Sequence, residues 1–295
     1  MFKCRFNANK IAATFVALYV LSRFFFKPSI KKDKIEHISD AIYKGTTWRN
    51  DRTVSVRTVA ETKFARCDVH TVVSEDGQKI VDDWIFLEEV NAVNIIVQTI
   101  EGEFIVFKQK KYAVPGETFS PVGGFVDDGE HPWISAKREV LEELGLGSRA
   151  TLQRIDKNFR TRGSNSFRND PNRVRNIVND VMLRNSAPPQ LDEYGIPQGN
   201  IPYPSDDPDW VYFGRYRTAV NRGGGFTYLY LLKNAVPLLP NGGDSSFTGV
   251  GDDEQQLIMR LSINEVRDFL SQARFQEIKW TAAFALSLLH INETH

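Results

Sequence analysis

Cysteine is scarce in this chain, and charge of one sign does not dominate it. The only two cysteines among the 295 residues are Cys4 and Cys67. Two thiols cannot complete a cysteine-based zinc site, and one bridge would add little to a chain long enough to bury its own core, so we expect both thiols to be free. Lys plus Arg and Asp plus Glu each total 37. The whole molecule therefore lacks the basic field that dedicated nucleic-acid-binding proteins use, and we expect no nucleic-acid partner.

The remaining composition is that of an ordinary globular protein. Hydrophobic residues make up 41% and charged residues 25% of the chain, which excludes disordered, collagen-like and disulfide-scaffold proteins. The length allows one large domain or two small ones, and no internal repeat is visible.

Basic residues are concentrated at the N-terminus. Residues 1–32 hold no carboxylate and seven cations, and within them Ile11 to Phe26 form a run of sixteen mostly apolar residues. As a helix this run would span about 24 Å, less than the roughly 30 Å of a hydrocarbon core, although flanking lysines could snorkel to the interfaces. Three interpretations stay open for residues 1–34: a single membrane anchor, a mitochondrial presequence, or a buried terminal helix. In each of them the chemistry lies in a separate catalytic domain, soluble in the first two, at 35–291.

Strand-like patterns and one helix precede the middle of the chain. A β-rich N-terminal region at about 45–90 is followed by a helix that begins at Pro132, has good helix formers to Leu144 and stops at Gly145. Turn residues between apolar runs predict two hairpins, 64–73 with 80–88 and 92–99 with 103–109.

The second half predicts an insertion followed by more strands and helices. Residues 156–209 are rich in Asn, Arg, Ser and Pro, which indicates a long surface insertion. The pattern then predicts strands at 210–216, 226–232 and 256–261, a loop at 241–253, and helices at 263–274 and 277–290. Strands and helices packed around one sheet indicate an α/β or α+β sandwich.

The helix after Pro132 carries an unusual set of charges. Glu139, Glu142 and Glu143 project from one side of it, next to Arg138. A solvated acidic face with Arg138 as partner would explain an isolated Glu-rich helix. The surrounding sequence is more specific, however, because Gly124-x5-Glu130-x7-Arg138-Glu139-Val140-x-Glu142-Glu143-x-Gly145-Leu146 matches the Nudix box G-x5-E-x7-R-E-U-x-E-E-x-G-U at every specified position. Chance would produce this match roughly once in 10⁷ chains.

The chain thus resembles the Nudix hydrolases, whose fold is an α/β/α sandwich with a mixed sheet. The resemblance implies that Glu139 and Glu143 bind metal, that Glu142 assists, and that the backbone carbonyl of Gly123 joins them. Magnesium, or manganese in its place, is the expected cofactor, since carboxylates are the hard oxygen ligands that magnesium prefers. Arg138 would orient the carboxylates.

Three further positions follow from the resemblance or from its context. Gly124, at the loop entry, and Gly145, at the helix exit, are interpreted as positions where the backbone conformation requires glycine. Glu130 either orients the loop or complements the helix dipole.

Within this family, the resemblance extends to ADP-ribose and ADP-sugar pyrophosphatases over about 45–155 and 210–291. Their pattern before the box is similar to Phe107-Lys108-Gln109-Lys110-Lys111-Tyr112 and Ser120-Pro121-Val122-Gly123-Gly124, and their acidic loop is similar to Gly251-Asp252-Asp253-Glu254. Glu254 would then activate or orient water, unless it is a solvated turn residue. Lys111 stands where the family often has Arg, and it would attract phosphate without the bidentate fork. Trp48 or Trp84 is a candidate for stacking on an adenine, and simple packing is the alternative for both.

The sequence therefore predicts a metal-dependent enzyme that hydrolyses the pyrophosphate bond of a nucleoside diphosphate derivative, with ADP-ribose or an ADP-sugar first. The alternatives are a non-catalytic nucleotide-sugar sensor of the same fold and a hydrolase of another nucleoside diphosphate-linked substrate. An isoprenoid diphosphate isomerase would need a cysteine partner, and Cys67 has no such context. An RNA-decapping enzyme is disfavoured, because the sequence shows neither a recognisable accessory domain nor a basic face. The resemblance also implies a homodimer. Residues 1–34, called the leader below, imply a membrane partner if they form an anchor.

Overall fold

A computed structural model of the chain describes residues 48–127, 130–161, 207–245, 247 and 256–293. The leader, residues 1–34, lies outside these ranges, so its role as an anchor or presequence stays a prediction. No helix in the described ranges is long and apolar enough to cross a membrane. Cys67 is a free thiol, as expected.

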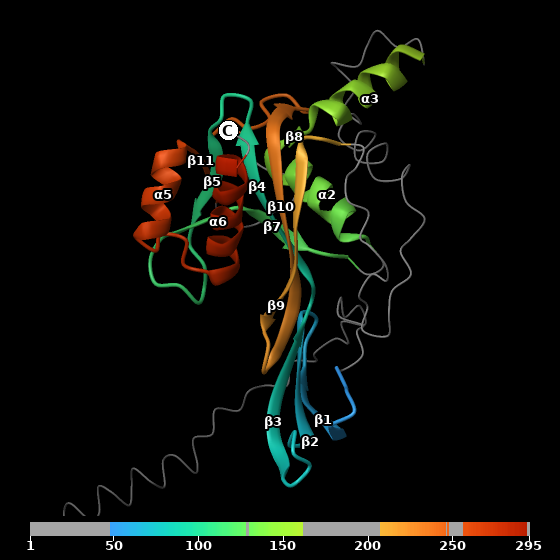
Figure 1. Cartoon of the computed structure of the whole chain (residues 1–295). Helices are drawn as coiled ribbons and strands as arrows, with labels where there is room; N and C mark the ends of the chain where they lie inside the picture. The colour runs from blue at the N-terminus through green and yellow to red at the C-terminus, as the bar shows by residue number, and fades with distance from the viewer. Residues whose placement is uncertain (1–47, 128–129, 162–206, 246, 248–255, 294–295) are drawn as a thin grey trace, which may run out of the picture. The chain divides into compact units, whose positions relative to one another are not determined.

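A mixed β-sheet with helices on both faces forms the framework, which confirms the expected sandwich. Helix α2 (Pro132–Leu144) covers one face, and helices α5 (Ile263–Ser271) and α6 (Ile278–Glu293) cover the other (Figure 1). The strands follow the order β1-β2-β3-β10-β4-β5-β11, with β6, β7, β8 and β9 paired beside this path. Their bounds are Thr53–Glu61 (β1), Ala65–Val73 (β2), Ile80–Glu89 (β3), Ala92–Thr99 (β4), Phe104–Gln109 (β5), Thr118–Ser120 (β6), Val122–Phe125 (β7), Leu146–Gly147 (β8), Trp210–Ala219 (β9), Gly223–Pro237 (β10) and Leu257–Leu261 (β11).

Strand β4 shows why helices are needed on both faces. Side chains alternate along a strand, and here each side carries buried apolar residues. Val93, Ile95 and Val97 are fully buried in the cluster that includes the apolar side of α2, whereas Ile96 is fully buried in the cluster that includes α5 and α6. The near-continuous apolar run that suggested a strand therefore reflects burial on two faces.

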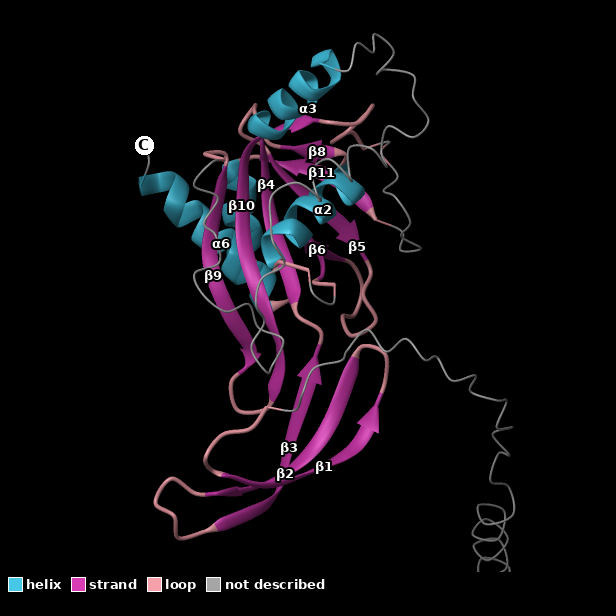
Figure 2. Ribbon diagram, turned by 90° about the vertical axis from the view of Figure 1, so that its right-hand side faces the viewer, coloured by secondary structure: helices cyan, strands magenta, loops and turns pink. Residues whose placement is uncertain are grey.

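Both predicted hairpins are present, and the edge strand β1 was not predicted individually. β2 pairs antiparallel with β3, and β4 pairs antiparallel with β5. The additional strand β1 pairs with β2 at the edge of the sheet (Figure 2). Most of its side chains are exposed. Because no face of β1 is deeply buried, its sequence carries little of the alternation that would have revealed it.

The β4–β5 hairpin opens away from its turn, and this opening positions the site. The two strands pair only at Val97–Ile105 and Gln98–Phe104. Beyond these pairs β4 instead takes β7 as its neighbour, and β5 takes β6. The short segment Thr118–Phe125 therefore lies between the parted strands, and it contains Gly124, the first residue of the box.

The predicted insertion begins later in the structure than its composition suggested. Helix α3 (Arg149–Thr161) continues to residue 161, past the expected start at 156. At the far end, Asp207 and Asp209 are buried rather than surface residues. Ser148 Oγ donates to Asp207 Oδ2 at 2.5 Å, and the Arg149 guanidinium binds Asp209 through both carboxylate oxygens at 3.2 and 2.9 Å. The reason for the difference is this long-range pairing, which local composition does not record.

Gly145 ends helix α2 in the left-handed conformation, with φ 65°, as the sequence predicted for a helix exit. Its amide donates to Leu141 O at 2.9 Å. A Cβ at this position would lie 2.8 Å from the ring of Phe247 and 3.1 Å from Gly242 Cα. Both the backbone conformation and the close packing therefore require glycine.

We expect Gly145→Ala to destabilise the protein more than Gly102→Ala. Gly102 also has a left-handed φ, 84°, but a Cβ there would meet nothing within 4 Å. The control substitution should cost about 1 kcal/mol for the backbone conformation alone, and Gly145→Ala at least about twice that because of the added crowding. Urea unfolding of both variants measures the difference. Equal losses would show that the packing around Gly145 relaxes freely.

Candidate active site

The start of helix α2 is fixed by its own sequence. His131 is the N-cap, and its Nδ1 accepts a hydrogen bond from the backbone N–H of Trp133 at 3.1 Å, while Pro132 occupies the first turn. Burial, followed by the charge of Lys137, lowers the pKa of His131, so the ring is neutral and suited to accept this bond. The helix therefore starts at a defined residue, which fixes the rotation of the box glutamates toward the sheet.

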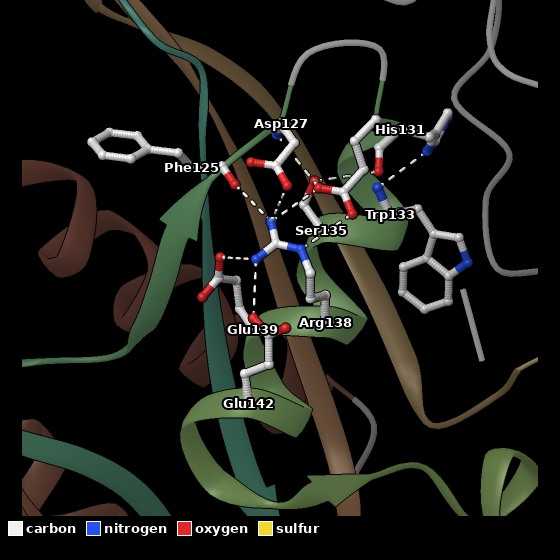
Figure 3. A network of polar contacts seen from close by, with 9 residues as sticks. Phe125, Asp127, His131, Trp133, Ser135, Arg138, Glu139 and Glu142 are labelled. Atoms are coloured by element: carbon white, nitrogen blue, oxygen red, sulfur yellow. Dashed lines mark hydrogen bonds and ion pairs between the residues drawn. The ribbon is translucent and has the colours of Figure 1, made fainter. Parts of the chain in front are cut away.

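Arg138 joins the helix to the loop before it (Figure 3). Its guanidinium donates to both carboxylate oxygens of Glu130, at 3.2 and 2.9 Å, and to Phe125 O at 3.0 Å. It also donates to Glu139 Oε1 at 2.6 Å and to Glu142 Oε2 at 3.2 Å. Although burial acts to lower the pKa of Arg138, the hydrogen bond to Glu130 and the charges of the surrounding carboxylates raise this pKa above its ordinary value. The arginine therefore carries a permanent charge.

Glu130 orients the loop between β7 and α2, which was one of its two expected roles. Besides Arg138, its Oε2 accepts from Ser135 Oγ at 2.7 Å and from the Asp127 amide at 3.4 Å. Asp127 itself lies 3.9 Å from Arg138. One carboxylate thus connects the loop, the first turn of the helix and the arginine.

Glu139 lies directly against Gly124, and this contact explains the glycine. A Cβ built at Gly124 would fall 2.0 Å from Glu139 Oε1, and the φ of Gly124 is outside the left-handed region. The prediction that the backbone conformation requires glycine here is therefore wrong. Glycine is required because the carboxylate of Glu139 occupies the space that a side chain would fill. Burial raises the pKa of Glu139 to about 7, and the charge of Arg138 offsets only part of this effect.

The other two glutamates differ in their surroundings. Burial also raises the pKa of Glu142, opposed by the charge of Arg138. Glu143, half-buried, lines a cavity of about 620 Å³. The three carboxylates thus share one helix, but two of them accept hydrogen bonds from Arg138 and the third lies on a cavity wall.

The cavity opens where strands β4 and β5 part. Four residues that the sequence predicted for the site lie on its wall: Gly123, Gly124, Glu143 and Lys111. Apolar and aromatic side chains, Phe107, Phe125, Ala113 and Val114, line another part of the wall. The structure therefore brings the box and the basic segment after β5 to one hollow.

Trp48 and Trp84 lie elsewhere. The Trp48 amide donates to Glu88 Oε1 at 3.0 Å, and the Arg217 guanidinium lies 5.6 Å from the centre of its ring. Trp84 Nε1 donates to Asn221 O at 2.7 Å. Neither tryptophan lines this cavity, and a stacking role for either stays a prediction.

Glu254 lies outside the described residues, and its role stays a prediction. Gln256, two residues further on, lines the cavity. One part of the cavity wall was not predicted from the sequence. It lies at the start of α6, on the opposite face of the sheet, and consists of Gln276, Glu277, Lys279 and Trp280. In the sequence, the only signal for these four residues is the pair of charged residues at the start of a mostly apolar helix.

Within the described ranges, no three His, Cys, Asp or Glu side chains form a group that could hold a metal ion. The expected ligands Glu139 and Glu142 are paired with Arg138 instead. One guanidinium faces four carboxylates, those of Asp127, Glu130, Glu139 and Glu142. The cluster therefore retains excess negative charge.

Comparisons with known proteins agree with this geometry. No curated protein sequence matches the chain. The solved structure of a protein described as an ADP compounds hydrolase aligns with a TM-score of 0.52 at 12% sequence identity, over 85% of this chain and 98% of the other, and this likeness concerns the fold. Residues 89–195 match the NUDIX domain model. These residues include the complete box from Gly124 to Leu146, so the match to the NUDIX domain covers the segment that carries the site.

Proposed function

We propose that this protein hydrolyses the pyrophosphate bond of a nucleoside diphosphate derivative, with ADP-ribose or an ADP-sugar as substrate and Mg²⁺, or Mn²⁺ in its place, as cofactor. The observation that carries the proposal is the shared cavity: Gly123 and the box residues Gly124 and Glu143 line it together with Lys111. Its volume of about 620 Å³ suits a nucleotide-sized ligand. The shared fold with an ADP compounds hydrolase supports the choice of an adenine nucleotide.

The residues present fit a divalent cation. The carboxylates around Arg138 outnumber the guanidinium, and the buried carboxyl of Glu139 has a pKa raised to about 7 because burial disfavours its charge. A cation would stabilise that charge. Glu139 and Glu143 would hold it, with Glu142 assisting and the Gly123 carbonyl as a further ligand. When bound, the ion would neutralise phosphoryl charge and make the phosphorus accessible to water.

The remaining residues of the site orient the reactants. Arg138 holds Glu139 and Glu142 in place from a loop that Glu130 fixes, so the carboxylates are preorganised. Lys111 attracts the substrate's phosphates as a point charge. The alternative of a non-catalytic sensor is disfavoured because the sequence retains every carboxylate of the box. A homodimer and a membrane-bound leader remain predictions.

A hydrolysis screen tests the proposed activity directly. The protein would be incubated with Mg²⁺ and with nucleotide sugars, dinucleoside polyphosphates and nucleoside triphosphates in turn, and the products would be identified by mass. We expect AMP and a sugar phosphate from ADP-ribose or an ADP-sugar. Tight binding of these compounds without any product would instead identify a sensor.

We expect Glu143→Gln to remove most turnover and to leave the fold intact. The amide keeps the shape of the side chain but loses the charge that binds metal, and Glu143 is only half-buried. A loss of about 10² to 10⁴ in kcat is the range for a group of this kind. Thermal unfolding provides the check on folding. Near wild-type activity at limiting Mg²⁺ would remove Glu143 from the metal site, and excess Mg²⁺ should rescue Glu142→Gln more than Glu143→Gln.

The raised pKa of Glu139 predicts a pH-dependent stability. Because this pKa is about 7 in the folded protein, against an ordinary value of 4.5, the folded state binds the proton more tightly than the unfolded chain. Ionised Glu139 therefore lowers the free energy of unfolding of the metal-free protein, fully so above about pH 7, and this loss disappears as the pH falls toward 4.5. We expect Glu139→Gln to raise the free energy of unfolding by roughly 1 to 3 kcal/mol at about pH 8, and to change it little at about pH 4.5.

Urea unfolding at both pH values, without metal, measures this difference between the variant and the wild type. In the wild type alone, the apparent affinity for Mg²⁺ should also rise with pH through about 7, since the ion displaces the proton of Glu139. A stability difference that is the same at both pH values would contradict the assignment.

We expect Glu254→Gln to lower kcat with little change in the apparent metal affinity. A residue that positions water acts mainly in the transition state, so its removal lowers kcat without weakening the ground state. Asp252→Asn and Asp253→Asn are matched controls on the same loop. If all three substitutions have the same effect, or if Glu254→Gln costs less than about threefold, loop charge alone explains it.

A further inference from the structure

The cavity has a second wall that the proposed reaction does not use. Gln276, Glu277, Lys279 and Trp280 line it from the start of α6, on the face of the sheet opposite to α2. Glu143 lines the same cavity from α2. A ligand in the opening between β4 and β5 can therefore contact the box at one end and the α6 wall at the other.

The α6 wall carries a charge pair rather than a free cation. Lys279 Nζ lies 2.8 Å from Glu277 Oε1, and the two side chains are 27% and 36% exposed. A bound phosphate would gain from the ammonium but would be repelled by the neighbouring carboxylate. A hydroxylated ring suits the pair better, because the carboxylate accepts hydrogen bonds from hydroxyl groups and the ammonium donates to them. Trp280 beside the pair is almost fully buried and offers an apolar surface.

The wall is held in a defined position. The Gln276 amide donates to Thr118 Oγ1 at 3.4 Å, which connects the segment before α6 to strand β6. Thr281 Oγ1 donates to Phe275 O at 2.9 Å, and the Thr281 amide donates to Glu277 O at 3.0 Å. These bonds fix the first turn of α6, so the pair is preorganised for a ligand.

Chemistry assigns the two halves of a nucleoside diphosphate sugar to different walls. A nucleobase offers a flat face for stacking, and two aromatic residues line the cavity: Phe107, which is buried in the cluster that includes α2, and the more exposed Phe125. Phe125 is 45% exposed and is stacked on Phe64, with ring centres 5.6 Å apart. The terminal sugar offers mainly hydroxyl groups, for which the α6 wall has the matching donors and acceptors.

We propose that Glu277 and Lys279 bind the hydroxyl groups of the terminal sugar and thereby select nucleoside diphosphate sugars over other nucleoside diphosphate esters. This inference rests on the proposed pyrophosphatase activity and names two residues that determine its specificity. Both residues act in binding and leave the chemistry to the box.

The test compares two substrates that differ only in the sugar. ADP-ribose and the β-methyl ester of ADP share the adenosine and the pyrophosphate, and the ester replaces the sugar by a methyl group. Glu277→Gln and Lys279→Met should each raise the KM for ADP-ribose about tenfold to hundredfold, the range for losing a hydrogen bond to a charged group. The kcat for ADP-ribose and the KM for the methyl ester should stay within about twofold of wild type.

Glu117→Gln is the matched control. Glu117 pairs with Lys108 at 2.9 Å and is more exposed than Glu277, at 53%, and neither partner lines the cavity. This substitution removes a similar pair and should leave both substrates unaffected. Thermal unfolding of all three variants detects any loss of folding, and the ratio between the two substrates is independent of the fraction of folded protein.

Three results would overturn the inference. An equal rise in KM for both substrates would place the adenosine half on the α6 wall. A fall in kcat for both at unchanged KM would give the pair a role in the chemistry, and wild-type behaviour of both variants would give it none. The proposed function survives each of these results, since it fails only if the wild-type protein hydrolyses neither substrate.

Discussion

One half-buried guanidinium, that of Arg138, organises the whole site. Arg138 connects the loop after β7, through Glu130 and Phe125 O, to the helix that carries Glu139 and Glu142. Because four carboxylates share one guanidinium, a change at any of them alters the charge that the others experience. Because the arginine remains charged at every accessible pH, changes in the protonation of Glu139 alter the balance of the cluster without releasing its geometry.

Much of the fold and the core of the site could be predicted from the sequence. The limits of α2 follow from Pro132 and Gly145, which have local meanings, and the box has a fixed spacing because every one of its residues lies on one helix or on the loop that enters it. The hairpins around Gly77 and Gly102 were predicted for the same reason: turns and alternating strands are local features. The pattern before the box likewise indicated Lys111, which the structure places in the cavity.

The rest depends on contacts between distant parts of the chain. The parting of β4 and β5 is visible only once β6 and β7 are paired, and the α6 wall reaches the cavity because α6 packs on the opposite face of the sheet. Gly124 has an ordinary backbone, so its reason is a carboxylate fifteen positions away in sequence rather than a turn. Trp48 and Trp84 lie away from this cavity, because residue type alone does not determine where an aromatic ring lies in the fold.

Two side-chain contacts bring the ends of a long segment together at one point of the fold: Ser148 binds Asp207, and Arg149 binds Asp209. Closing a loop costs entropy that grows only with the logarithm of its length. Once its ends are fixed, the chain between them can therefore gain or lose many residues at a cost of well under about 1 kcal/mol. The framework that carries Gly145 and helix α2 is thus insulated from changes in the number of residues between these two ends.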